Sequence, residues 1–275
     1  MIEDLFFLEK QTYKKSIIHD LDARVKIVVS FAAIVAMVAV PYSPLVMPVA
    51  VAFAIFFAGI WALSRLPPMV YARRLAMVLP FGLFIILMQV FLQNPYYTVF
   101  TPVATLPFGL HIYRESVEFA AILLSKFLVC ISFIILLSST TRVQDLLKGA
   151  GRLGLPAEFT LTLGMMIRYL FVFGYMYRKT TESLATRCFQ PFDSRLPYRY
   201  RLRTLAYTIG TLFVRSYEQG ERTYLAMVCR GYGRESHLYI RKKPLLRRDA
   251  AFLATGLCVV VAVPVLFWLS STGLL

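Results

Sequence analysis

Two short segments of the chain carry similar residues in the same order, and each contains one arginine. The first is Ala185-Thr186-Arg187-Cys188-Phe189 and the second is Val228-Cys229-Arg230-Gly231-Tyr232. A guanidinium offers a fork of N–H donors that fits carboxylates and carbonyl oxygens, and a helix C-terminus favours a cation by roughly 0.3–1 kcal/mol. Each arginine taken singly also fits a solvated charge. The repetition identifies two similar helix ends whose arginines suit either role.

Each segment is predicted to close a long amphipathic helix. Gly154-Leu155-Pro156 opens the first helix, because proline is tolerated at a helix start. The second helix follows the cluster Arg195–Arg203 and ends at Gly231, a residue type that commonly terminates helices. A rigid helix with an exposed arginine at its end can pass force between a soluble partner and a membrane bundle.

Other polar residues fit structural roles at least as well as chemical ones. Lys126 lies in an apolar run and suits either an ion path or a pairing with another helix. Asp20 and Asp22 are expected to cap the first helix rather than to bind metal. The histidines, scattered along the chain, are not expected to be ligands; they are His19, His111 and His237.

The sequence lacks the motifs of several enzyme classes. It has no P-loop, so we expect that it does not hydrolyse ATP. No Cys-x-x-Cys pair or His/Cys/carboxylate cluster suits zinc, cobalt or nickel, so no metal site or cofactor is predicted. Asp22-Ala23-Arg24 resembles part of a phosphatidyltransferase signature, but the paired aspartates that should follow it are absent. The four cysteines are far apart and disulfides are not expected.

The composition is that of a membrane protein. Hydrophobic residues make up 58% of the chain and charged residues 16%, against about 45–50% and about 25% in globular domains. The net charge of +15 is concentrated in residues 142–249, which hold 20 of the 30 basic and 8 of the 15 acidic side chains. Because these bases alternate with apolar helix faces, nucleic-acid binding is not expected.

Apolar runs predict an all-α polytopic fold with about five transmembrane helices. Residues 27–63 carry no charge, and one helix of that length would be nearly twice the roughly 30 Å hydrocarbon core. The turn Pro41-Tyr42-Ser43-Pro44 therefore divides this stretch into two spans. The remaining spans are predicted at 75–93, 116–138 and 250–275.

The positive-inside rule orients these spans. With the N-terminus in the cytoplasm, residues 140–248 also lie inside, and the loop 94–114 lies outside with Tyr96, Tyr97 and Phe100 at the interface. Residues 155–177 are apolar enough to cross, but crossing at 155–177 and 205–227 would put seven bases outside. We therefore expect two amphipathic cytoplasmic helices there.

The predicted organisation is a cytoplasmic N-terminal segment 1–26, transmembrane helices 27–138, a cytoplasmic coupling-helix domain 139–248 and a last transmembrane helix 249–275.

Four stretches together resemble the transmembrane T component of energy-coupling-factor transporters, most closely the CbiQ type associated with cobalt uptake. They are His19–Lys26, with Ala23 where the family usually has proline, Thr140–Pro156, Arg168–Phe171 and Arg215–Tyr232. In that family two Ala-Arg-Gly-like tripeptides end the coupling helices and dock into grooves on two ATPase subunits. Here Cys229-Arg230-Gly231 keeps the Arg and Gly, whereas Thr186-Arg187-Cys188 keeps only the Arg. The departure bears on the geometry of the first site.

The resemblance implies a non-catalytic coupling subunit of an ATP-driven importer for cobalt. Its partners would be ABC-type ATPase subunits (a homodimer or a heterodimer) and a substrate-binding membrane subunit of S or M type, in a cell inner (plasma) membrane. Nickel or a vitamin remain alternative substrates. A self-contained channel or carrier is the alternative from another functional class.

Overall fold

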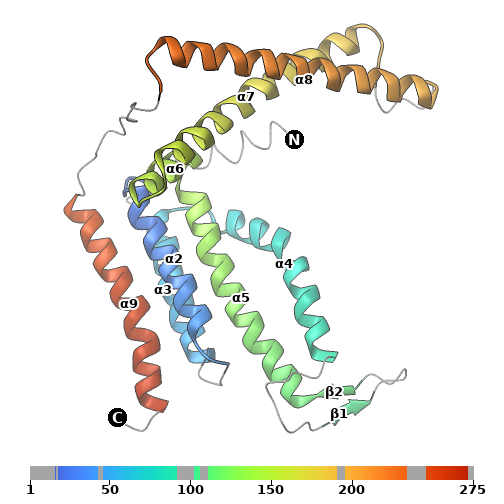
Figure 1. The fold of residues 1–275 in the computed structure, drawn as a ribbon. Helices are drawn as coiled ribbons and strands as arrows, with labels where there is room; N and C mark the ends of the chain where they lie inside the picture. Colours follow the sequence, from blue (N-terminus) through green and yellow to red (C-terminus); the bar gives the residue numbers. More distant parts are fainter. Residues whose placement is uncertain are drawn as a thin grey trace. The chain divides into compact units, whose positions relative to one another are not determined.

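A computed structural model describes residues 16, 18–42, 46–91, 102–105, 111–190, 196–233 and 246–271. These residues form eight helices and one short antiparallel pair of strands (Figure 1). They divide into two units. The first comprises the described residues up to Leu153 together with the C-terminal helix, and the second begins at Gly154 and contains the two long helices. The predicted all-helical class is confirmed.

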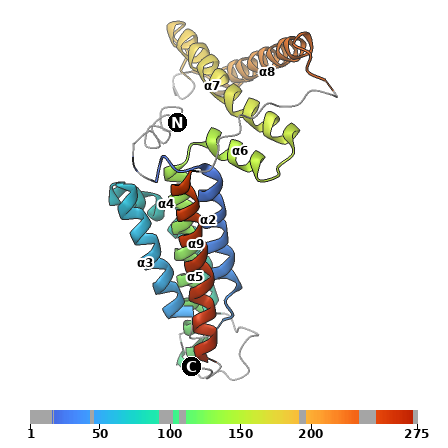
Figure 2. The same cartoon turned by 90° about the vertical axis from the view of Figure 1, so that its left-hand side faces the viewer.

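Five helices of the first unit lie side by side as a bundle (Figures 1 and 2). Helix α5 packs against α2, α3 and α4, and α2 also packs against α9. The bounds of these helices are α2 Ala23–Ala39, α3 Val46–Ser64, α4 Pro68–Phe91, α5 Arg114–Thr140 and α9 Arg247–Ser271. These are the five stretches in which the sequence predicted spans.

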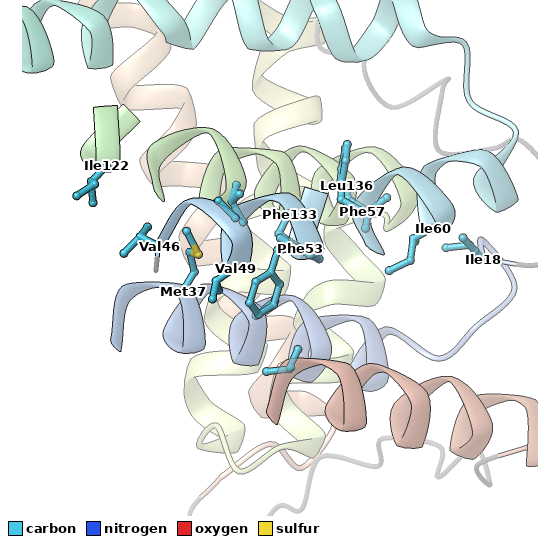
Figure 3. Packing of buried hydrophobic residues seen from close by; sticks show 14 of the residues in the cluster. Ile18, Met37, Val46, Val49, Phe53, Phe57, Ile60, Ile122, Phe133 and Leu136 are labelled. Atoms are coloured by element: carbon cyan, nitrogen blue, oxygen red, sulfur yellow. The ribbon is translucent and has the colours of Figure 1, made fainter. Parts of the chain in front are cut away.

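The bundle core is built mainly from stripes of α2, α3 and α5, with Val260 of α9 packed among them. On α3 the buried positions are Val46, Val49, Ala50, Phe53, Phe57 and Ile60, which follow the three- and four-residue spacing of a helix face. Phe53 and Phe57 meet Phe133 of α5 edge-on, with ring centroids 6.3 and 6.0 Å apart (Figure 3). Because lipid is as apolar as these side chains, close packing rather than exclusion of water holds such helices together.

The opposite faces of the same helices are apolar and uncovered. Ile55 on α3 is 69% exposed, and Met77 and Phe81 on α4 are each 78% exposed. A soluble protein rarely exposes contiguous apolar surface of this kind. These faces suit contact with lipid, and the chain is a multi-pass membrane protein.

Five described helices are long and apolar enough to cross a membrane: α3, α4, α5, α7 and α9. The predicted number is therefore confirmed, but the set differs at one helix. Helix α2 has 17 residues, about 25 Å, which lies at the lower limit for a span. Helix α7 (Ala157–Thr186) is included because, like the other four, it is judged by length and composition only, and its predicted place in the cytoplasm stays a prediction.

Helix α4 begins earlier than predicted. The span was predicted to begin at residue 75, but the chain is helical from Pro68 onward, so Arg73 and Arg74 belong to the helix. Proline suits a first helical position because its missing N–H has no partner to lose there. Arg74 donates to the hydroxyls of Ser139 (2.8 Å) and Ser138 (3.2 Å) on α5, which holds its charge at the helix ends.

The loop between α4 and α5 contains two short strands that the sequence did not reveal. Strands β1 (Pro102–Thr105) and β2 (His111–Tyr113) pair antiparallel, with Ala104 opposite Ile112. Their short length and the prolines around them masked the alternation that predicts a strand. The predicted interfacial residues Tyr96, Tyr97 and Phe100 lie outside the described residues, as do Pro44 of the first turn and His237.

Helix α6 (Val143–Arg152) belongs to the first unit. It packs on α2, where Gly149 faces the start of that helix. The compact units thus divide between Leu153 and Gly154, whereas the predicted cytoplasmic domain begins at residue 139. That predicted boundary concerns membrane topology, which packing does not test. Packing does place α6 in the same compact unit as the bundle.

Candidate functional site

The second unit consists of two long helices whose C-terminal ends have the same backbone geometry. Helix α7 ends at Thr186 and helix α8 (Tyr198–Cys229) ends at Cys229. Arg187 and Arg230 occupy the C-cap positions, both with φ of −91°. The two predicted docking arginines are therefore equivalent positions on two helices.

The residues after each arginine complete a Schellman motif, in which two amides bond back to the last turn. At the end of α7, Phe189 N–H donates to Leu184 O (3.1 Å) and Cys188 N–H to Ala185 O (3.0 Å). At the end of α8 the corresponding bonds run from Tyr232 to Met227 (3.0 Å) and from Gly231 to Val228 (2.9 Å). The motif accounts for the shared order of residues in the two segments.

Cys188 takes the position that Gly231 holds in the second motif. Its φ is +58° and that of Gly231 is +79°, both in the left-handed region. Glycine adopts this region freely, whereas a residue with a Cβ pays roughly 1–2 kcal/mol. The departure from Ala-Arg-Gly at the first site thus leaves the backbone geometry intact and adds local strain.

Both arginines are presented outward. All six predicted docking residues are exposed: Thr186, Arg187, Cys188, Cys229, Arg230 and Gly231. Within the described part of the chain, no carboxylate forms an ion pair with either guanidinium. The Thr186 hydroxyl donates to Ser183 O (2.8 Å) within its own helix, so it shapes the surface rather than offering a free donor. Both guanidinium groups are therefore exposed and carry no ion pair among the described residues.

The aromatic residue two positions after each arginine differs in its surroundings. Phe189 is 5% exposed and its ring meets that of Tyr200 at the start of α8, 6.1 Å between centroids. Tyr232 is 38% exposed. The chain that follows the first arginine is therefore packed against the neighbouring helix, whereas the corresponding residue after the second arginine is exposed.

The two arginine-bearing ends are well separated. Helices α7 and α8 also contact each other where the hydroxyls of Tyr169 and Thr223 are hydrogen-bonded. From that contact the chain rises roughly 27 Å along α7 to Arg187, and roughly 10 Å along α8 to Arg230. Since α8 returns antiparallel to α7 from the Phe189–Tyr200 contact, the two ends point in opposite directions. They form two sites, not one composite site.

Lys126 in the bundle has a structural set of partners. Its ammonium group donates to the main-chain carbonyls of Val38 (3.3 Å) and Val40 at the end of α2, and lies 4.2 Å from the centroid of the Tyr42 ring. Carbonyls at a helix C-terminus lack partners within the helix and carry partial negative charge. Of the two roles left open for Lys126, the contacts favour the pairing between helices.

Asp22 caps α2, as the sequence predicted. Its carboxylate accepts a hydrogen bond from Arg24 N (3.2 Å), whereas Asp20 lies in the preceding turn and is exposed. Among the described residues, no three His, Cys, Asp or Glu side chains are grouped to hold a metal ion, and the four cysteines are unpaired. The sequence alone did not reveal the partners of Asp22 on α6 and α9, because those residues are distant from it along the chain.

Comparison with known proteins agrees with this arrangement. A family model described as the cobalt transport protein CbiQ matches residues 14–240. The uncharacterized protein MJ1571 of Methanocaldococcus jannaschii is 25% identical over 273 residues, which cover 96% of this chain and 87% of that protein. The uncharacterized protein MJ1089 of the same organism is 24% identical over 169 residues, 62% of this chain and 60% of that protein. The family match spans most of the chain and both arginine-bearing helix ends, and the chain belongs to the CbiQ family of cobalt transport proteins.

Proposed function

We propose that this chain is the coupling T subunit of an energy-coupling-factor importer, in which Arg187 and Arg230 dock into two ATPase subunits. Membership in the CbiQ family implies a non-catalytic transmembrane subunit. The observation that carries the finer proposal is the pair of equivalent helix ends. Each presents an exposed arginine from the same Schellman geometry, and no carboxylate among the described residues pairs with either guanidinium.

Two equivalent ends suit a partner that has two equivalent grooves. ABC-type ATPases work in pairs, either as a homodimer or as a heterodimer, and each member would receive one arginine. A carboxylate or a set of carbonyl oxygens in each groove would accept the guanidinium fork. Because the helices are 30 and 32 residues long, about 45–50 Å each, a displacement at one end is carried as a rigid body.

The proposed topology places the N-terminus and both long helices in the cytoplasm of a cell with an inner (plasma) membrane, where ATP is available. The dense positive charge of residues 142–249 supports this side. Helices α2, α3, α4, α5 and α9 would cross the bilayer beside a substrate-binding subunit, so that the four crossings before α6 return the chain to the cytoplasmic side. That subunit, rather than this chain, would select the substrate.

Cobalt is the substrate that the family description supports. The described residues offer no grouping of metal ligands, so Co²⁺ would be captured by the substrate-binding subunit. Measuring metal bound to that subunit after co-purification tests the assignment. Recovery of nickel or of an organic vitamin in place of cobalt would contradict it.

Charge reversal at the two arginines tests the docking role. In Arg187→Glu and Arg230→Glu we expect the protein to remain in the membrane while recovery of the ATPases on affinity purification falls at least tenfold, as expected for removal of a charge-assisted contact. Arg199→Glu is the matched control. It makes the same charge change in the first turn of α8, where an acidic residue is compatible with the helix dipole.

Full ATPase recovery by the double variant Arg187→Glu/Arg230→Glu would refute the docking role. Equal loss with the Arg199→Glu control would also refute it, because nonspecific charge attraction would then explain the binding.

A further inference from the structure

A group of charged residues joins helices of the first unit that are remote in sequence. At its centre is Asp22, whose side chain is 9% exposed. Its carboxylate lies 3.6 Å from the Arg24 guanidinium and 3.5 Å from that of Arg152, the last residue of α6. One carboxylate at the start of α2 therefore holds the end of α6.

The main chain of Asp22 joins the same position to α9. Its N–H donates to Asp249 Oδ1 (3.1 Å), and the other oxygen of Asp249 accepts from Leu246 N (3.0 Å). Asp249 is 5% exposed and lies in the first turn of α9. Its carboxylate thus caps α9 and binds α2 across 227 residues of sequence.

Lys26 ties α2 to the end of α5. Its ammonium donates to Thr140 O (3.2 Å), among the last carbonyls of α5, and to His19 O (3.2 Å). The residue is 5% exposed. We call Asp22, Arg24, Lys26, Arg152 and Asp249 the charged clasp. It gathers α2, α5, α6 and α9 at one end of the bundle.

Helix α6 meets the bundle mainly through α2. Gly149 is its one fully buried residue, and it lies so close to α2 that a Cβ added there would be 3.1 Å from Ala23 Cβ. A buried ion pair is not a strong source of net stability, since its desolvation offsets much of the attraction. What a clasp of directional charged contacts provides is one defined placement of α6 against α2 and α9.

We infer that the charged clasp transmits the motion of the coupling helices into the bundle, with Asp22 as its central positioning residue. Arg152 is followed within five residues by Ala157, the first residue of α7. A force on α7 therefore reaches the bundle through α6, and the clasp converts it into a joint movement of α2 and α9. The transport consequence rests on the proposed function, but the mechanical attachment does not.

The attachment can be tested on the full chain in detergent micelles by hydrogen–deuterium exchange. In Asp22→Asn we expect the amides of α6 to exchange about tenfold faster than in the wild type, because the ion pair with Arg152 is lost and local openings of lower cost become frequent. The first turn of α9 is held through the main chain of residue 22 and should change little. Amides of α3 should be unaffected. Asp20→Asn is the matched control, since Asp20 is an exposed neighbour that loses the same charge.

The transport consequence is tested in the whole complex in proteoliposomes. We expect Asp22→Asn to retain the ATPases and their ATP hydrolysis while radioactive Co²⁺ imported per ATP hydrolysed falls at least fivefold. A disulfide in Asp22→Asn/Ala23→Cys/Gly149→Cys should restore the ratio, because it fastens α6 to α2 covalently. Its Cβ atoms would need to part by only a few tenths of an ångström to reach disulfide geometry. Mass spectrometry of an unreduced digest confirms the cross-link.

Three results would overturn the inference: unchanged exchange of α6 in Asp22→Asn, faster exchange with an unchanged Co²⁺/ATP ratio, or a complete cross-link that fails to restore the ratio. Loss of the ATPases in the Arg187 and Arg230 variants belongs to the docking proposal and is read separately. If the wild-type complex imports no Co²⁺, the cobalt assignment fails and the exchange result alone decides whether the clasp exists.

Discussion

Substitution of Cys188 measures the conformational strain that the Schellman motif imposes at the end of α7. Its φ of +58° places a residue with a Cβ where the equivalent Gly231 has none. Relief of the left-handed strain in Cys188→Gly should gain roughly 1–2 kcal/mol. The greater freedom of glycine in the open state returns about 0.4–1 kcal/mol. The expected net gain is about 1 kcal/mol for closing the end of α7.

The amide of Phe189 reports this gain, because its N–H is bonded to Leu184 O only while the motif is closed. A gain of about 1 kcal/mol corresponds to about fivefold stronger protection of that amide from hydrogen exchange. Exchange should be measured on the full chain in detergent at one pH. The rate of each variant should be compared with the intrinsic exchange rate of its own sequence. Because Arg187 is unchanged, ATPase recovery should be retained.

Cys188→Ala separates backbone strain from the chemistry of the thiol. It removes the sulfur and keeps the Cβ, so protection of Phe189 should stay near the wild-type value. Gly231→Ala applies the opposite change at the second site and should weaken protection of Tyr232. Equal gains for alanine and glycine at Cys188, or no gain for glycine, would refute the strain argument.

Two further predictions concern the bundle. A Cβ at Gly82 would meet the Phe127 ring at 1.9 Å, so Gly82→Ala should destabilise the bundle by about 1–3 kcal/mol in SDS titration, whereas Gly59→Ala, with open space around it, should not; equal effects would contradict this packing. Lys126→Met removes the donors to the end of α2 and should cost about 1 kcal/mol in the same titration, near the value of polar contacts between membrane helices. Loss of Co²⁺ uptake with unchanged stability would instead favour an ion-path role for Lys126.

Local signals in the sequence were sufficient for the long helices and for the two arginine-bearing helix ends. Apolar runs bounded by charges and prolines predict helical spans, because a bilayer requires every backbone group to be satisfied within its own segment. The ends of α7 and α8 were also predictable, since capping depends on residues within one turn. The same locality explains why Asp22 was identified as a cap from its position alone.

The tertiary structure decided everything that depends on residues distant along the chain. Asp22 contacts Arg152 and Asp249, which lie 130 and 227 residues away in the sequence. No local sequence pattern predicts either contact. The assignment of α6 to the bundle rests on the fit of Gly149 against Ala23, which is a matter of shape. The role of Lys126 also depends on tertiary structure, because its partners are carbonyls at the end of α2, far away in the sequence.

The geometry of the two arginine-bearing helix ends depends both on local sequence and on tertiary contacts. The order of residues predicted two similar helix ends, because the types that suit each position act locally. That Cys188 adopts the same left-handed conformation as Gly231 could not be predicted, since cysteine has no preference for it. Two bonds to the preceding turn and the packing of Phe189 on Tyr200 outweigh a strain of roughly 1–2 kcal/mol. Only the folded pair of helices supplies that second contact.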